Sequence, residues 1–265
     1  MMNRLFFCFA LGAIGCGSGD GASSGMSPAT TLRVSLGAST ATYPHQDALA
    51  SQTATQVRAG VRSLELIDDQ GTPWPIYTAQ GEATTVSYDN GARTQLTELE
   101  PSALKPGKYV RARLVQDWSR FDITATLHDG NTTTSGTLSV LQVTSDGTSM
   151  NGTMYDGGDY EHSFAAAGQQ PQSFTGAAPI PDHSTTAEAE AHVESGAWAV
   201  YFPVDIQITD QSLGTLSIVA NMDHAFRWTD LSSAGYQDAV YDIAPPLYEV
   251  VEQFGANRFD VALTP

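Results

Sequence analysis

Apolar and polar residues alternate with a period of two along most of the chain after residue 31. The alternation is clear in three short segments, at 32–36, 110–114 and 121–127; in the second, Val110, Ala112 and Leu114 alternate with arginines. Such a period places the apolar side chains on one face of a β-strand. The three segments therefore predict half-buried strands.

Two longer alternating runs follow, at 198–208 and 216–228. In the second run, Met222, His224 and Phe226 share the apolar face. Both runs exceed the usual length of a strand, so we expect each to bend or to carry a bulge. Pro203 lies on the polar face of the first run and cannot donate a ladder hydrogen bond, which favours an edge or a bulge there.

Turn dipeptides separate these segments: Asn90-Gly91, Asp129-Gly130, Asp146-Gly147, Asn151-Gly152 and Asp156-Gly157. Asn, Asp and Gly tolerate the positive φ that tight hairpin turns require. Many strands joined by such turns predict an all-β protein with an antiparallel β-sandwich body over residues 31–265. A boundary near 130–135 would give two lobes, whereas the reading of 121–140 as one hairpin favours a continuous body.

Two segments carry helix signals. Residues 185–194 are rich in Ala and Glu, which favour helix, yet they also alternate, and we prefer the strand interpretation. Residues 247–255 follow Pro245-Pro246 and end at Gly255. Proline before and glycine after a segment are typical helix boundaries, so this segment predicts one short helix.

The N-terminus has a different pattern. Arg4 precedes an apolar run at 5–14, which is followed by Gly15-Cys16 and by a stretch rich in Gly and Ser. This order is typical of a secretory signal. It resembles the precursors of bacterial lipoproteins, whose cysteine is acylated and becomes the mature N-terminus. Ala13 stands where that family usually has Leu.

The resemblance implies a signal peptide over 1–15, a lipidated Cys16 and a flexible tether over 16–30. It also implies the bacterial cell envelope, and Gly17, rather than Asp, implies the outer membrane. A short transmembrane anchor and a secretory signal cut elsewhere are the alternatives. The apolar run is about half of the roughly 20 residues needed to span a bilayer, so lipid attachment is preferred.

Charge and cysteine content narrow the functions that the body can have. The chain carries 12 Lys and Arg against 29 Asp and Glu, a net charge of −17. Such a charge repels phosphate backbones, which excludes nucleic acid as a partner; carbohydrate, protein and cation partners remain. Both cysteines, Cys8 and Cys16, precede the body, so it contains neither disulfides nor thiolate chemistry.

No catalytic motif is present: the chain lacks a G-x-S-x-G elbow, H-E-x-x-H, a P-loop and a G-x-G-x-x-G in a strand–helix context. The sequence therefore favours a non-enzymatic binding or structural module held at a membrane by its lipid anchor. The alternatives are an exported hydrolase that uses loop carboxylates and a lipoprotein that binds a divalent metal.

Several residue groups are candidate sites, although no cofactor is required. If 187–194 is a strand, one face carries carboxylates and an imidazole that could coordinate a divalent cation: Glu188, Glu190, His192 and Glu194. A solvated strand face is the competing interpretation. Further candidates are His224 with Met222 for copper, loop aspartates for calcium (Asp156, Asp159, Asp230, Asp238 and Asp242), and tyrosines for stacking on sugars (Tyr155, Tyr160, Tyr236, Tyr241 and Tyr248).

Overall fold

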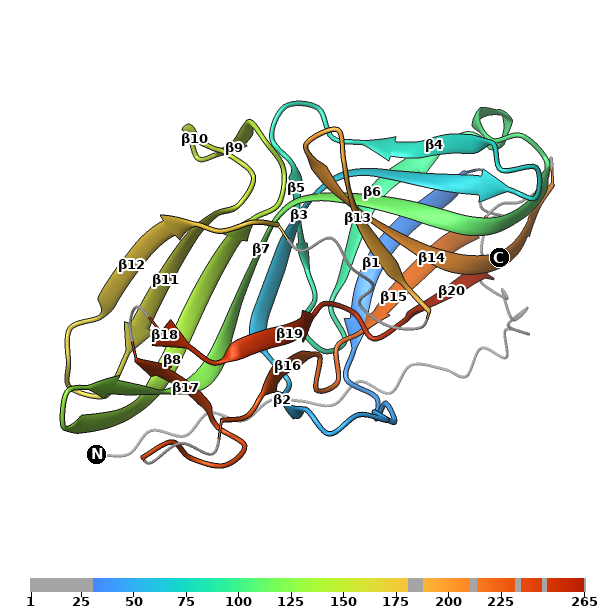
Figure 1. Ribbon diagram of the computed structural model, residues 1–265. Helices are drawn as coiled ribbons and strands as arrows, with labels where there is room; N and C mark the ends of the chain where they lie inside the picture. Colours follow the sequence, from blue (N-terminus) through green and yellow to red (C-terminus); the bar gives the residue numbers. More distant parts are fainter. Residues whose placement is uncertain (1–30, 181–187, 210–213, 232–234, 245–246, 265) are drawn as a thin grey trace, which may run out of the picture.

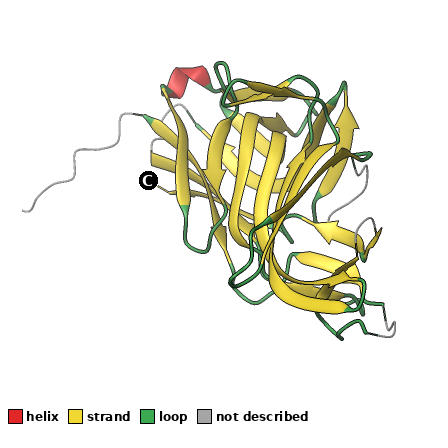
Figure 2. Cartoon of the chain, turned by 90° about the vertical axis from the view of Figure 1, so that its left-hand side faces the viewer, coloured by secondary structure: helices red, strands yellow, loops and turns green. Residues whose placement is uncertain are grey.

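The computed structural model describes residues 31–180, 188–209, 214–231, 235–244 and 247–264. Strands make up 66% of the described residues and helix 1%, and Figure 2 shows strands throughout. Because an ordinary globular protein is about one third helix, the all-β prediction is confirmed. Within the described ranges the one helical element is the 3₁₀ turn η1 (Pro101–Ala103), and no helix is long and apolar enough to cross a membrane.

The largest sheet has eleven strands and forms the body of the molecule (Figure 1). Six of its strands follow one another in the order β12, β11, β8, β7, β14, β13, and five more branch from this path. The path strands are β12 (Gln172–Ala177), β11 (Asp159–Ala165), β8 (Thr132–Val143), β7 (Gly107–Asp129), β14 (Ala197–Ile208) and β13 (Glu190–Glu194). The branching strands are β3 (Thr55–Asp68), β4 (Pro73–Thr78), β5 (Thr84–Ser87), β17 (Tyr241–Ala244) and β18 (Leu247–Tyr248).

β7 is the centre of this sheet. Its 23 residues join two predicted strands, 110–114 and 121–127, into one. On one side, β7 pairs first with β14 and then, from Trp118, with β8. On the other side it pairs with β3 and, in parallel, with β17. The β7–β8 hairpin turns at Asp129-Gly130, as predicted.

Two smaller sheets pack against the large one and complete the sandwich-like body. The first contains β20 (Phe259–Thr264), β15 (Gly214–Asn221), β1 (Leu32–Ser39) and β6 (Arg93–Leu99), in that order. Phe202 of β14 stacks on Phe259 of β20, with their rings 4.1 Å apart. The second contains β19 (Val250–Phe254), β16 (Phe226–Thr229) and β2 (Ala50–Gln52), and a separate hairpin is formed by β9 (Thr148–Met150) and β10 (Thr153–Tyr155).

The hydrophobic core is continuous across these layers. It includes Leu36 of β1, Leu66 of β3, Leu114 of β7, Ile218 of β15 and Trp228 of β16, each at most 1% exposed. A core that large stabilises a chain whose body has no disulfide.

β-Bulges interrupt the strand pairing at positions where the alternation of buried and exposed side chains is broken. The β7–β14 register shifts between Pro203 and Ile206, as the proline predicts. The β3–β7 register also shifts, between Ile67 and Asp68, which turns Val110 outward, and its side chain is 38% exposed. The prediction that Val110 shares the buried face is therefore wrong, because an extra residue in a strand reverses the side on which its neighbours point.

Of two predictions for segments that carry helix signals, one is corrected and one is confirmed in part. The segment 247–255, predicted as a helix, forms strands β18 and β19. Val250 and Val251 are β-branched and pair with β16, and this pairing outweighs the helix signals at the ends of the segment. The strand interpretation of 185–194 holds for Glu190–Glu194, while 181–187 lie outside the described residues.

The run 216–228 is not one strand. It is divided into β15 and β16 by a turn in which His224 has a φ of 48°. Asn221 Oδ1 accepts a hydrogen bond from the backbone N–H of Asp223 at 3.2 Å, a local bond that competes with the strand ladder. His224 is consequently exposed rather than on an apolar face.

Candidate ligand-binding cavity

One face of β7, β8 and β11 forms an apolar floor. The strand register places Phe121 opposite Val140, and Val140 opposite His162. The next row on the same face pairs Ile123 with Leu138. Cross-strand neighbours on one face of a sheet lie close together, so these side chains form a continuous surface.

The sheet of β2, β16 and β19 covers this floor. Phe254 of β19 lies over Phe121, with ring centroids 3.8 Å apart, and Phe226 of β16 lies 5.8 Å from the same ring. In Figure 1, β19 and β16 run across the lower half of the large sheet. The contact thus joins residues that are more than a hundred positions apart in the sequence.

Floor and cover do not fill the space between them. A cavity of about 250 Å³ remains, lined by the floor residues and by Tyr241, Val251 and Phe254 among others. A second, smaller cavity of about 40 Å³ adjoins it and shares Ser119, Trp198 and Phe254. The cavity is open to solvent, since Val251 and Glu252 in its lining are exposed, and an open, mainly apolar cavity of this size is a candidate binding site.

Two residues of the lining each have a buried side-chain nitrogen without a hydrogen-bond partner. The two atoms are Nδ1 of His162 and Nε2 of Gln253. The His162 ring lies between Tyr160, at 4.6 Å, and Tyr248, at 5.6 Å. Burial lowers the pKa of His162 below its ordinary value, because an apolar environment disfavours the charged imidazolium.

The charge of the cavity is also distinctive. Its lining contains no Lys or Arg, and its one carboxylate, Glu252, accepts a hydrogen bond from Thr229 Oγ1 at 2.7 Å. Beside it, the β18–β19 segment exposes apolar side chains: Leu247 is 69% and Val250 58% exposed. The cavity is therefore apolar, lacks cationic side chains and has an apolar surface next to it.

A buried cluster of acidic groups lies next to Tyr241, at the end of β17. His128 Nε2 lies 2.6 Å from Asp242 Oδ1, and Asp242 is fully buried. Both oxygens of Glu249 accept backbone N–H groups, from Asp242 at 2.8 Å and from Leu231 at 2.7 Å. Burial, together with the charge of Asp242, raises the pKa of Glu249. Because these carboxylate oxygens already accept protein donors, the cluster fixes β17 against β7.

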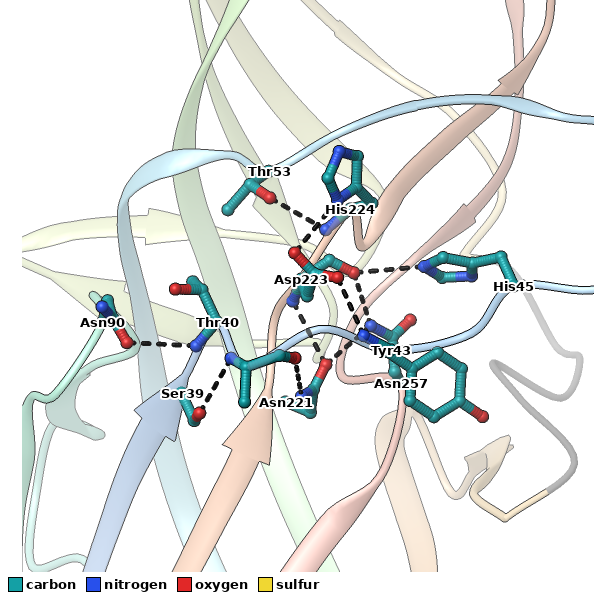
Figure 3. A network of polar contacts seen from close by, with 11 residues as sticks. Ser39, Thr40, Tyr43, His45, Thr53, Asn90, Asn221, Asp223, His224 and Asn257 are labelled. Atoms are coloured by element: carbon teal, nitrogen blue, oxygen red, sulfur yellow. Dashed lines mark hydrogen bonds and ion pairs between the residues drawn. The ribbon is translucent and has the colours of Figure 1, made fainter.

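A second polar network surrounds Asp223, in the turn that separates β15 from β16 (Figure 3). Asp223 Oδ2 accepts the N–H of Tyr43 at 2.9 Å, and its Oδ1 lies 3.0 Å from Nδ1 of His224. Asn257, which is fully buried, donates through Nδ2 to Asn221 Oδ1 at 2.9 Å. These bonds join three distant segments and explain why the chain turns here. Met222 is buried whereas His224 points outward.

The predicted metal-binding face is occupied by arginines. Glu190 bonds to Arg111, and this hydrogen bond, first among several causes, lowers the pKa of Glu190. Glu194 accepts hydrogen bonds from Arg113, at 2.9 Å, and from Tyr201 Oη, at 2.8 Å. Nε2 of His192 lies 3.6 Å from Glu190. The register places Glu190, His192 and Glu194 on one face of β13, as predicted; Glu188 lies before the strand.

Among the described residues, no group of three or more His, Cys, Asp and Glu side chains is arranged to hold a metal ion. The divalent-cation, copper and calcium hypotheses stay predictions. Of the loop aspartates, Asp159 accepts a hydrogen bond through Oδ2 from the backbone N–H of Asp156 at 2.8 Å. Asp230 accepts one through Oδ2 from the backbone N–H of Ala239 at 2.8 Å. Cys16 lies outside the described residues.

The tyrosines predicted to stack on sugars lie in different surroundings, and their contact with carbohydrate stays a prediction. Tyr241 is buried and donates to the backbone oxygen of Glu249 at 3.0 Å, and burial raises its pKa. Tyr160 and Tyr248 flank His162, whereas Tyr155 bonds to Glu161 and Tyr236 stacks on His128.

Sequence reasoning missed His162 and Gln253. His162 lies between Tyr160 and Phe164 in a short alternating run, which is the one local signal that it faces the same side as an apolar residue. Gln253 gives no such signal. Comparison of the chain with protein families, with curated proteins and with solved structures finds no match.

Proposed function

We propose that this protein is an exported, lipid-anchored binding protein whose cavity takes up a small apolar ligand. The observation that carries the proposal is the cavity of about 250 Å³ between β7, β8, β11 and the covering strands. Apolar cavities of about 150 Å³ in other proteins bind benzene-sized molecules, and drug-sized ligands occupy about 300–1,000 Å³. The volume therefore suits a ligand between these two sizes.

The proposed anchor is Cys16, followed by the tether over 16–30. Two or more acyl chains attach a protein stably to a membrane. Changing Cys16 to Ser is expected to move the protein from the membrane fraction to the soluble fraction. Membrane retention of the Cys16→Ser protein would contradict the anchor but leave the cavity untouched.

The cavity is tested with N-phenyl-1-naphthylamine, an uncharged dye that fluoresces strongly in apolar surroundings. The full chain carrying Cys16→Ser avoids competition from lipid. We expect saturable fluorescence for this chain and its loss on Val140→Phe, because the added ring would fill the cavity. Val110→Phe is the matched control, since Val110 lies on β7, is partly exposed and does not line the cavity. Equal dye binding by both variants would refute the proposal.

The competing function is an exported hydrolase. The His128–Asp242 pair is the arrangement that favours it, because an Asp-oriented imidazole can act as a general base. A hydrolase screen with the His128→Gln protein as the control decides between the two, and turnover that depends on His128 would favour the enzyme.

A further inference from the structure

The candidate cavity is long and narrow rather than compact. Its lining includes two cross-strand pairs of the floor, Ile123 with Leu138 at one end and Ser119 with Gln142 at the other. Four residues of strand separate the two pairs, a distance of about 13 Å. Spread over that length, the volume of about 250 Å³ leaves a mean cross-section of about 19 Å².

This cross-section sets the thickness of a ligand. Carbon atoms in contact lie about 3.5–4.0 Å apart, so one hydrocarbon chain occupies roughly 12–16 Å². The cavity thus has room for one chain but not for two chains side by side. Its length also suits a chain. With single bonds of roughly 1.5 Å, an extended chain advances about 1.3 Å per carbon, so about ten carbons span the distance between the two pairs.

The mouth of the cavity lies at β19, near the Ile123 end. Val251 and Glu252 of the lining are exposed there. Val251 pairs with Trp228, whose ring lies 5.7 Å from that of Tyr241. Tyr241 also lines the cavity, and its strand β17 pairs with β7 just beyond Ile123.

Ser119 lies at the end away from the mouth. Together with Trp198 and Phe254 it lines both this cavity and the smaller one that adjoins it. A chain that enters at the mouth and spans the cavity therefore ends beside Ser119. The size of this residue should limit the length of chain that fits.

We propose that the cavity holds one unbranched hydrocarbon chain of an amphiphile, which enters tail first at β19 and leaves its polar head outside. This inference rests on the proposed function and specifies the ligand class for that site. The lining contains no Lys or Arg that could bind a charged head inside the cavity. Leu247 and Val250, which are exposed on the neighbouring segment, offer an apolar surface next to the mouth.

Isothermal titration of the full Cys16→Ser chain with hexan-1-ol, octan-1-ol and decan-1-ol tests the inference. We expect the affinity to rise about fourfold for each added methylene. Ser119→Leu should weaken decan-1-ol about tenfold and leave hexan-1-ol unchanged, because only the longer chain reaches Ser119.

Ser135→Leu is the matched control. Ser135 lies on the neighbouring strand β8, is exposed and does not line the cavity, so this variant should keep the parent's affinity for all three alcohols. Ser119→Val is a smaller change at the same place and should weaken decan-1-ol less than Ser119→Leu does. Circular dichroism shows whether each variant is folded, and Ser119→Val carries the test if Ser119→Leu is not.

The position of the head is tested with octyl-β-D-glucoside, which has the chain of octan-1-ol on a bulky uncharged head. Because the head stays in water, we expect the glucoside and the alcohol to bind alike. A glucoside that binds more than about tenfold more weakly than octan-1-ol would overturn the tail-first orientation.

The outcomes separate the inference from the proposed function. An equal effect of the folded Ser119 variants on all three alcohols, or no effect on any, would overturn the inference and leave an apolar binding site that does not measure chain length. Binding of the naphthylamine dye without binding of the alcohols would do the same. The absence of binding by the alcohols and by the dye would overturn both.

Discussion

Truncation of Phe121 tests whether the cavity is a real space in the folded protein. Phe121 lies on β7, is 4% exposed, packs directly against Phe254 and Phe226, and lines the cavity. The change Phe121→Ala removes a ring from the floor and joins its volume to the existing cavity.

The expected loss of stability follows from what the ring contacts. Replacing a buried Phe by Ala costs about 3–5 kcal/mol in a filled core. One side of the Phe121 ring faces the cavity and has fewer protein atoms to lose, so we expect the lower end, about 3 kcal/mol. For a chain of this size the melting temperature should fall by about 6–12 °C.

Phe164→Ala is the comparison. Phe164 on β11 is 2% exposed and does not line the cavity, so its truncation should cost about 4–5 kcal/mol. Urea unfolding followed by circular dichroism measures both variants against the Cys16→Ser parent. If Phe121→Ala destabilises the protein as much as Phe164→Ala does, the ring is fully packed and the reasoning fails.

Three further predictions concern other features. Because burial lowers the pKa of His162, the folded protein should lose stability as the pH falls from about 7 to about 5, through the ordinary histidine value near 6.5; His162→Phe should lessen this loss in urea titrations, and an unchanged pH profile would contradict it. A Cβ on Gly60 would overlap the indole of Trp118, whereas one on Gly107 would meet open space; we expect Gly60→Ala to cost roughly 1–3 kcal/mol in unfolding free energy and Gly107→Ala much less, and equal costs would show that the indole moves aside. If zinc, copper or calcium binds the β13 face, calorimetric titration should show that His192→Ala loses the site, while equal binding by the parent and the variant, or binding by neither, would favour a solvated strand face.

The sequence predicts the class of fold well because the signal is local. Period-two alternation and Asn-Gly or Asp-Gly turns depend on neighbouring residues, and the turn at Asn151-Gly152 forms with positive φ at both positions. The secondary-structure prediction is wrong at two places where contacts with distant segments determine the local structure. Pairing with β16 makes 250–254 a strand, and polar bonds to distant segments break the run at His224.

The cavity could not be predicted in the same way. Its floor comes from β7, β8 and β11 and its cover from β16 and β19, so its existence depends on how well two surfaces fill the space between them. Alternation predicts which side of a strand is apolar, but not whether the facing side chains leave a gap. The partnerless state of Gln253 likewise depends on three-dimensional placement.

The pairing of β1 has a consequence for the order in which the chain can assemble during synthesis. β1 is translated early, yet one of its two neighbours, β15, begins only at Gly214, opposite Leu32. Until then β6 alone can cover β1, and its other edge stays open to any strand it meets. Parallel pairs that span so much of a chain form slowly. The nascent protein therefore carries a strand with one open edge until Gly214 has been translated, and open strand edges of this kind are where incomplete chains aggregate unless chaperones cover them.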